Sequence, residues 1–252
     1  MGAPSVLFVH AHPDDESLWT GGTIARIVEA GSTTSVLTCT WASGTPRHTE
    51  LTSALRILGV DAPIALGYAD GGFPESAPQS AALCECRFDD AVRQIVEHIR
   101  RLRPDIVVTY DAYGIYGHPD HIQAHRLALA AVEAAACAPL YPDAGPAWQT
   151  RSLYLSTVPT RVMHRIRHQV TTGPPPEGAV PPGTPDAAID LELDVSAWVE
   201  QKWSAIGAHR SEMDRSPALV ELAELDVARR NALLGTEWYL RRDLVVGGAD
   251  LV

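Results

Sequence analysis

Short apolar runs alternate with amphipathic stretches along the first half of the chain. The runs are rich in β-branched residues and bounded by polar, Gly or Pro positions, at residues 6–9, 34–40, 63–66 and 106–110. Continuous apolar runs of this length are typical of strands buried on both faces of a parallel sheet. The stretches between them have helical periodicity and end at a Gly or before a Pro, at residues 18–30, 50–58 and 85–102.

This alternation of strand and helix implies βαβ units with right-handed crossovers. We expect an α/β fold, with a Rossmann-like open and mostly parallel sheet flanked by helices, and a smaller C-terminal lobe. Ligands of such sheets bind beyond the carboxyl ends of the strands. The residues that carry chemistry should therefore follow directly after the apolar runs.

The second half of the chain has a less regular pattern. Residues 171–185 read TTGPPPEGAVPPGTP, which suits neither a helix nor a central strand, and we expect there either a lid or a surface connector. A short alternating stretch and two helical patterns follow, at residues 189–195, 196–212 and 217–234. We expect one domain over 1–252, with a Rossmann-like core at 1–140 and a C-terminal part at 150–252.

Charge and hydropathy exclude several classes of partner. The 252 residues include 20 Lys and Arg against 31 Asp and Glu, which gives a formal net charge of −11. An acidic chain without a dense basic run lacks the positive field that attracts nucleic acid or anionic membranes, so we expect neither partner. No stretch has the ~20 apolar residues of a membrane span or the pattern of a secretory leader. We expect a cytoplasmic protein with a small-molecule substrate, and leave homo-oligomerisation open.

Cysteines and chain length bear on the role of any metal. Cys39, Cys84, Cys86 and Cys137 have neither a redox nor a zinc-ribbon spacing, so we expect free thiols. A domain of this length buries enough apolar surface to fold without a structural metal. A metal site in this chain should therefore be functional.

A first chemical cluster, His12-Pro13-Asp14-Asp15-Glu16, directly follows the first apolar run. Acidic residues in the first turn of a helix complement its dipole, and capping alone would account for Asp14 or Asp15. Capping does not account for His12 beside two adjacent carboxylates, whose repulsion would raise a carboxylate pKa. A bound divalent cation removes that repulsion, so the cluster indicates a metal site. No glycine-rich phosphate motif follows, which leaves nucleotide binding a weak alternative.

A second cluster, which includes His118, Asp120, His121 and His125, follows the fourth apolar run. Pro119 suits the first turn of a helix, and we expect His118 at its N-cap. A lone helical His is more often a packing residue, but this grouping favours metal ligation. His121 and His125 lie four apart on one helix face, a spacing that chelates zinc in some folds. Two imidazoles and one carboxylate drawn from both clusters would form a hydrolytic zinc site with an open position for water.

The two clusters resemble, in order and spacing, the motifs of the PIG-L/LmbE-like N-deacetylases. The matching pieces are His12-Pro-Asp-Asp-Glu16 and His118-Pro-Asp-His121, and supporting matches lie at residues 14–22, 47–50, 66–70 and 202–209. The resemblance therefore spans most of the chain. The segment 40–45 departs from it, because it lacks both the Gly-Glu and the longer insertion of other members, so the substrate mouth should differ.

The resemblance implies a metal-dependent hydrolase that removes the acetyl group from an N-acetylglucosamine-type conjugate and releases acetate and a free amine. It makes His12, Asp15 and His121 the metal ligands and Asp14 the general base. The cofactor would be Zn²⁺, with Fe²⁺ and Co²⁺ as alternatives, because such ligand sets accept several divalent ions.

The resemblance also assigns the groups around the metal. It places a protonated His118, held by Asp120, at the developing oxyanion or the leaving amine, with Tyr116 nearby. Arg47 and Asp70 match positions that contact the sugar. Two other functions stay open: an amidase that cleaves a larger acyl group, and a metal-binding module without turnover.

Overall fold

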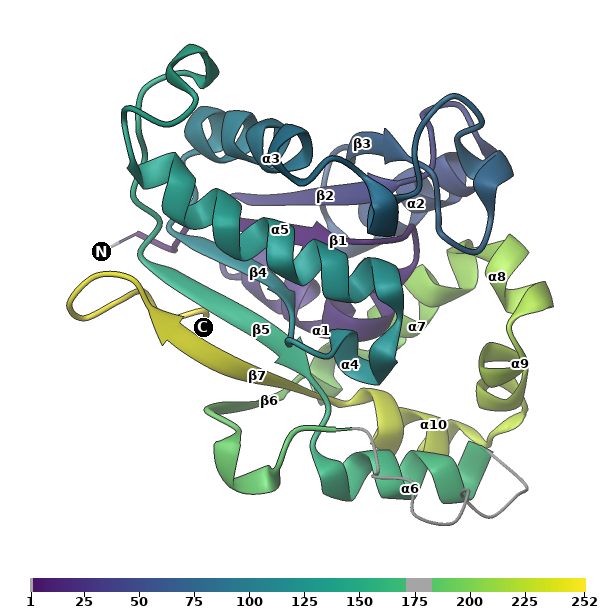
Figure 1. Cartoon of the computed structure of the whole chain (residues 1–252). Coiled ribbons are helices and arrows are strands. Elements are labelled where there is room, and N and C mark those ends of the chain that lie inside the picture. Colours follow the sequence, from purple (N-terminus) through teal and green to yellow (C-terminus); the bar gives the residue numbers. More distant parts are fainter. Residues whose placement is uncertain (1, 171–182) are drawn as a thin grey trace.

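A seven-stranded sheet between two layers of helices forms the centre of this computed structural model, which describes residues 2–170 and 183–252 (Figure 1). The strands are β1 (Val6–His10), β2 (Thr34–Thr40), β3 (Ile64–Tyr68), β4 (Ile106–Tyr110), β5 (Ser152–Thr157), β6 (Leu191–Asp194) and β7 (Thr236–Asp243). The helices are α1 (Asp15–Glu29), α2 (Pro46–Leu58), α3 (Phe88–Leu102), α4 (Gly114–Gly117), α5 (Pro119–Ala136), α6 (Thr160–Val170), α7 (Val199–Ala208), α8 (Arg210–Arg215), α9 (Pro217–Glu224) and α10 (Val227–Leu234).

The strand order, β3-β2-β1-β4-β5-β7-β6, fixes where a ligand can bind. The first five strands in this order are parallel, whereas β7 is antiparallel to both β5 and β6. The chain leaves β1 towards β2 and β3, then crosses back to place β4 on the other side of β1. The loops after β1 and β4 therefore diverge at a topological switch point, which is where open α/β sheets bind ligands.

Alternate side chains of the strands build two separate apolar layers. Leu7 and Val9 of β1 face α3 and α5, whereas Val6 and Phe8 face α1, α2 and α7. All four side chains are buried, as expected for a central parallel strand. This two-sided burial holds β1 rigidly and fixes the point at which its loop begins.

The expected α/β fold is confirmed, and the first four strands lie within about two residues of their expected positions. β5 and β7 were not expected, because β5 carries polar residues at buried positions and β7 directly follows a helical pattern. The helical pattern over 196–212 is interrupted at His209, whose backbone (φ −81°, ψ 64°) separates α7 from α8. Most of the Pro-rich loop, residues 171–182, lies outside the described residues. Among the described helices, none is long and apolar enough to span a membrane.

A buried ion pair fastens α1 to the C-terminal part of the chain. Nζ of Lys202, the only lysine in the sequence, lies 2.7 Å from Oε1 of Glu237 at the start of β7. The Glu237 carboxylate also accepts hydrogen bonds from the backbone N–H groups of Gly22 and Thr23 in α1. Because α1 follows the first chemical cluster directly, this contact helps to position that cluster.

Removing one member of this pair should destabilise the fold. We expect Lys202→Met to lower the free energy of unfolding by about 3 kcal/mol, because it leaves a buried carboxylate without its cation. Urea unfolding measures the change. Arg210→Met, which removes an exposed cation at the start of α8, is the matched control and should change stability by less than about 0.5 kcal/mol. Equal effects of the two substitutions would contradict a stabilising role for the pair.

Candidate metal centre and active site

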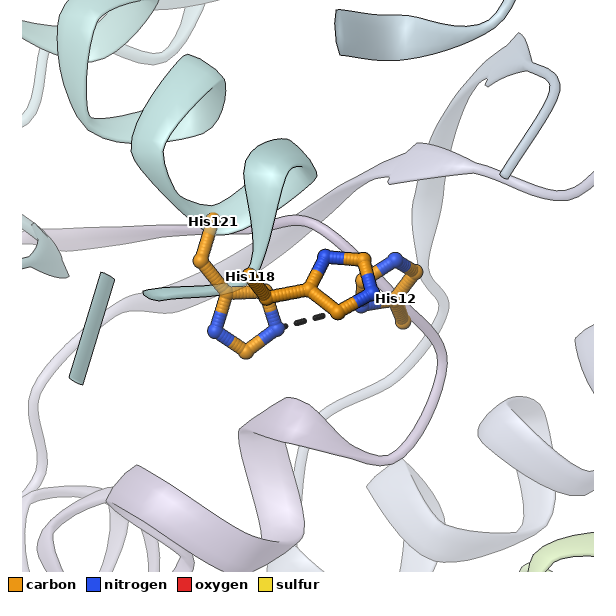
Figure 2. Close-up of side chains that lie close together, drawn as sticks. All are labelled: His12, His118 and His121. Atoms are coloured by element: carbon orange, nitrogen blue, oxygen red, sulfur yellow. Dashed lines mark hydrogen bonds between the residues drawn. The ribbon is translucent and has the colours of Figure 1, made fainter. Parts of the chain in front are cut away.

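Three donor atoms from the two sequence clusters converge at the switch point. Nδ1 of His12 lies 3.2 Å from Nε2 of His121, and the Asp15 carboxylate oxygens lie 3.3 Å from each of these nitrogens. Ligands at about 2.0–2.2 Å from a tetrahedral zinc are themselves roughly 3.4 Å apart, so this spacing suits a metal. Figure 2 shows the His12 and His121 rings together with that of His118. The expected ligands are thus brought together, and their role stays a prediction.

Two hydrogen bonds hold the Asp15 carboxylate in this position. Its Oδ2 accepts from the His12 backbone N–H and from the Tyr110 hydroxyl, both at 2.7 Å. The Tyr110 ring also stacks on His121, with centroids 4.3 Å apart. Tyr110 therefore positions two of the predicted ligands. The sequence analysis missed it, because a Tyr at the end of an apolar strand cannot be told from a core residue.

The carboxylates around His12 favour a positive charge at this point. Burial opposes protonation of His12, but its hydrogen bonds with Asp120 and Asp15 outweigh burial and raise its pKa to about 10. Burial would raise the pKa of Asp15, but the facing His121 and His12 rings hold it well below its usual range. A bound divalent cation would neutralise the same carboxylates that the protonated His12 neutralises. The residues therefore fit a bound metal.

Asp120 contacts a different histidine from the one expected. Its Oδ2 lies 3.2 Å from Nε2 of His12, and its carboxylate also accepts from the backbone N–H groups of Gly71 and Cys84. The carboxylate therefore bonds His12, whereas Asp120 contacts His118 through its backbone N–H, and its role in holding His118 stays a prediction. A carboxylate that accepts from one ring nitrogen leaves the other as a lone-pair donor, so Asp120 directs Nδ1 of His12 towards the metal position.

His118 lies at the N-cap of α5, as expected, and its Nδ1 accepts from the Asp120 backbone N–H at 3.2 Å. This hydrogen bond requires an unprotonated Nδ1, so the neutral ring carries its proton on Nε2. Burial and the nearby His12 and His121 rings lower the pKa of His118. The expected protonated form is therefore not favoured, and the ring donates from Nε2 while neutral.

A second donor set overlaps the predicted ligands. His118 brings a nitrogen within 4.8 Å of donor atoms on His12 and His121, and another grouping joins His12 and His118 to Asp70 and Asp120. His125 belongs to neither grouping, because its Nδ1 bonds the Tyr110 backbone carbonyl. The spacing of His121 and His125 on one helix face therefore does not form a chelate.

Asp14 occupies a strained position that leaves its carboxylate available. Its φ of 126° is unusual for a residue with a side chain, and it makes no capping hydrogen bond although it is the N-cap of α1. Oδ2 instead lies 3.1 Å from the Arg47 guanidinium. Burial raises the pKa of Asp14 to about 7, against the opposing effect of Arg47. A carboxylate that gains its proton near neutral pH is suited to general-base catalysis.

Two buried residues to which the sequence analysis gave no role, Glu16 and His209, position the Asp14 backbone, Glu16 directly and His209 through Glu16. Oε2 of Glu16 accepts from the Asp14 N–H at 3.0 Å, and Oε1 pairs with Nε2 of His209 at 2.8 Å. Arg47 contributes a third contact through its hydrogen bond to the Pro13 carbonyl. His209 lies about 190 residues further along the chain, so no local pattern could have revealed this pair.

The remaining predicted residues line the same cavity, which has a volume of about 600 Å³. Arg47 also pairs with Glu212 at 2.8 Å, and Asp70 lies 3.6 Å from Nε2 of His12. Tyr116 is half exposed, with its ring 5.1 Å from that of His121. Of the predicted site residues, only Asp120 and His121 do not line the cavity; both are fully buried and contact His12 from behind its lining.

Comparison with known proteins relates this site to a family. Residues 7–132 match the family model described as GlcNAc-PI de-N-acetylase, or PIG-L. A relative from Rhodococcus erythropolis is 38% identical over 251 residues, covering 88% of this chain and 85% of the relative. It is named 1D-myo-inositol 2-acetamido-2-deoxy-alpha-D-glucopyranoside deacetylase. The match to the family model contains both predicted clusters.

Solved structures share the fold at lower identity. An N,N'-diacetylchitobiose deacetylase from Pyrococcus horikoshii is 18% identical, with a TM-score of 0.66 over 96% of this chain and 84% of that one. A 4-carboxy-2-hydroxymuconate hydratase from Pseudomonas putida is 19% identical, with a TM-score of 0.63 over 98% and 99% of the two chains. These neighbours show the fold, and their different reactions show that the fold alone does not determine the chemistry.

Metal loading should separate the two adjacent aspartates. We expect His12→Ala, Asp15→Ala and His121→Ala each to reduce bound Zn²⁺, because each removes one of three protein ligands. Asp14→Asn should retain near-normal metal. Elemental analysis after dialysis and the absorption spectrum of the Co²⁺-loaded protein provide two measurements.

His164→Ala, which removes an exposed histidine on α6, is the control for histidine loss and should load normally. Unchanged stoichiometry in any of the three ligand variants would remove that residue from the set. Equal metal loss in Asp14→Asn would make Asp14 a ligand instead.

Proposed function

This chain belongs to the PIG-L, or GlcNAc-PI de-N-acetylase, family, and we propose that it removes the acetyl group from an N-acetylglucosamine-type conjugate, releasing acetate and a free amine. The observation that carries the proposal is the convergence of donor atoms from His12, Asp15 and His121. Asp14 lies beside them, and its carboxylate is not one of the predicted ligands. The name of the relative from Rhodococcus erythropolis favours loss of acetyl over that of a larger acyl group.

A divalent cation, which we propose to be Zn²⁺, would supply Lewis-acid polarisation of the acetamide carbonyl and a water of lowered pKa. His12, Asp15 and His121 would hold it. Asp120 would accept from Nε2–H of His12 and so orient Nδ1 towards the cation, which would replace the Nδ1 proton, and Tyr110 orients Asp15. These contacts fix the ligands before substrate enters, which lowers the cost of reorganisation.

Asp14 accepts the proton of the attacking water and then delivers it to the leaving amine. The Nε2–H group of His118 stabilises the developing oxyanion as a neutral donor, a contribution typically of a few kcal/mol. Arg47 keeps Asp14 ionised, and Arg47 and Asp70 contact the sugar. Tyr116 lies beside the His118 and His121 rings. Each of these groups lines the cavity.

Acetate release tests the proposed activity. The zinc-loaded protein should release equimolar acetate and free amine from a glycoside of N-acetylglucosamine. Asp14→Asn should lower kcat by roughly 10²-fold or more while metal content stays normal, because it removes the general base. Asp61→Asn, at an exposed aspartate, is the control and should retain full activity. Retained activity in Asp14→Asn would move the base elsewhere, and no acetate from the wild type would reject the activity.

The pH profile tests the role of Arg47. Because the base must be ionised, activity is lost as pH falls through the pKa of Asp14. Arg47 lowers that pKa, so Arg47→Met should move the acid limb of kcat to higher pH and cost more activity at pH 6 than at pH 9. A bound cation lowers the pKa in both proteins, so the difference between them is the measured quantity.

Arg56→Met, at an exposed arginine of the same helix, controls for the loss of a positive charge and should leave the limb in place. An unchanged acid limb in Arg47→Met, whatever its effect on KM, would show that Asp14 does not set that limb.

A further inference from the structure

The cavity has two chemically different sides. Charged and polar side chains from the loops after β1, β2, β3 and β4 form one side around the metal position. Apolar side chains form the other, which we call the apolar wall; its main members are Leu18, Met163, Leu219, Leu222, Leu233 and Trp238. These residues come from α1, α6, α9, α10 and β7, so the wall belongs mainly to the C-terminal half of the chain. Figure 1 shows α9 and α10 beyond the carboxyl ends of the parallel strands.

Few polar groups interrupt the apolar wall. Nε1 of Trp238 has no hydrogen-bond partner among the described residues, and Arg215, Ser216 and Thr236 also line the cavity. Lys202 and Glu237 reach the cavity but bond each other at 2.7 Å, and both are almost fully buried. The Thr157 hydroxyl bonds the Asp111 carboxylate. A polyol placed against this wall would lose hydrogen bonds to water without replacing them, at a cost of about 1–3 kcal/mol for each group.

The cavity is also larger than the reacting group requires. Its volume of about 600 Å³ lies within the range of roughly 300–1,000 Å³ typical of sites for drug-sized ligands. An acetyl group has a single methyl to bury, whereas the wall is built from four helices and a strand. The occupant of the wall is therefore a separate and larger apolar group.

We propose that the apolar wall binds an uncharged alkyl or aryl substituent attached to the sugar, so that the preferred substrate is an apolar glycoside of N-acetylglucosamine rather than a polyol conjugate. This inference rests on the proposed deacetylase activity. The cavity is continuous from the metal position to the wall, so one molecule contacts both. The sugar of the bound substrate lies on the polar side of the cavity, and its substituent packs against the leucines of the apolar wall.

A series of glycosides tests the inference. Methyl, benzyl, octyl and myo-inositol glycosides of N-acetylglucosamine, all of one anomer, are compared by acetate release from the zinc-loaded protein. We expect kcat/KM to rise at least about tenfold from methyl to benzyl or octyl, chiefly through a lower KM, because several apolar carbons leave water. The myo-inositol glycoside should show no such gain.

Matched variants on α9 locate the effect. Leu222 is partly buried and lines the cavity, whereas Val220 of the same helix is exposed and does not. We expect Leu222→Gln to lower kcat/KM for the benzyl glycoside by about tenfold and for the methyl glycoside by much less. Val220→Gln should leave both values unchanged, and Leu222→Met should preserve most of the benzyl preference.

A measurement without turnover separates failure of the inference from failure of the activity. Calorimetry of the deacetylated products should show tighter binding of benzyl glucosaminide than of methyl glucosaminide, and Leu222→Gln should abolish the difference. Equal kcat/KM for all glycosides, or a preference for myo-inositol, would overturn the inference while the activity stands. Faster cleavage of N-hexanoyl than of N-acetyl methyl glycoside, sensitive to Leu222→Gln, would assign the wall to the acyl group and overturn it. No acetate from any glycoside would reject the activity and the inference together.

Discussion

Negative charge concentrated beyond β1 and β4 is the constraint on which the site depends. Asp14 and Asp15 follow the end of β1, and Asp120 lies in the first turn of α5 after β4. Asp15 and Asp120 are buried and Asp14 is partly buried, so water screens their repulsion poorly. The protein compensates with two kinds of positive charge. Arg47 neutralises Asp14, while the remaining carboxylates surround His12 and raise its pKa. Binding of a divalent cation there exchanges a proton for a metal, so the same carboxylates that strain the apo site stabilise the loaded one.

The two adjacent aspartates acquire different roles because their surroundings differ. Asp15 faces two imidazoles and accepts from Tyr110, so its charge is stabilised and its orientation is fixed. Asp14 has a positive φ of 126°, and its carboxylate pairs with Arg47 and has no hydrogen bond to either imidazole among the described residues. The Glu16–His209 pair holds this conformation from the C-terminal half of the chain. Environment rather than residue type therefore distinguishes the proposed ligand, Asp15, from the proposed base, Asp14.

Local patterns in the sequence were sufficient for much of the fold and for the two chemical clusters. Continuous apolar runs located β1, β2 and β4, and Pro119 located the start of α5, because these signals depend on neighbouring residues alone. β5 and β7 escaped detection, since their burial depends on pairing with distant strands. The same reason explains Tyr110, His209 and Glu212, whose roles exist only through contacts across the fold. The hydrogen bond of Asp120 to His12 likewise depends on a register between two loops that spacing does not reveal.

The polar side and the apolar wall of the cavity come from different halves of the chain. The N-terminal half supplies every predicted metal ligand and the base, at positions fixed by a sheet that is buried on both faces. The C-terminal half supplies the apolar wall from short helices that the parallel strands do not constrain. Substitution in these helices alters what lies against the sugar without moving the donors around the metal. In such an arrangement the surface that contacts the rest of the substrate can change while the donors around the metal position stay in place, because the two are held by different parts of the fold.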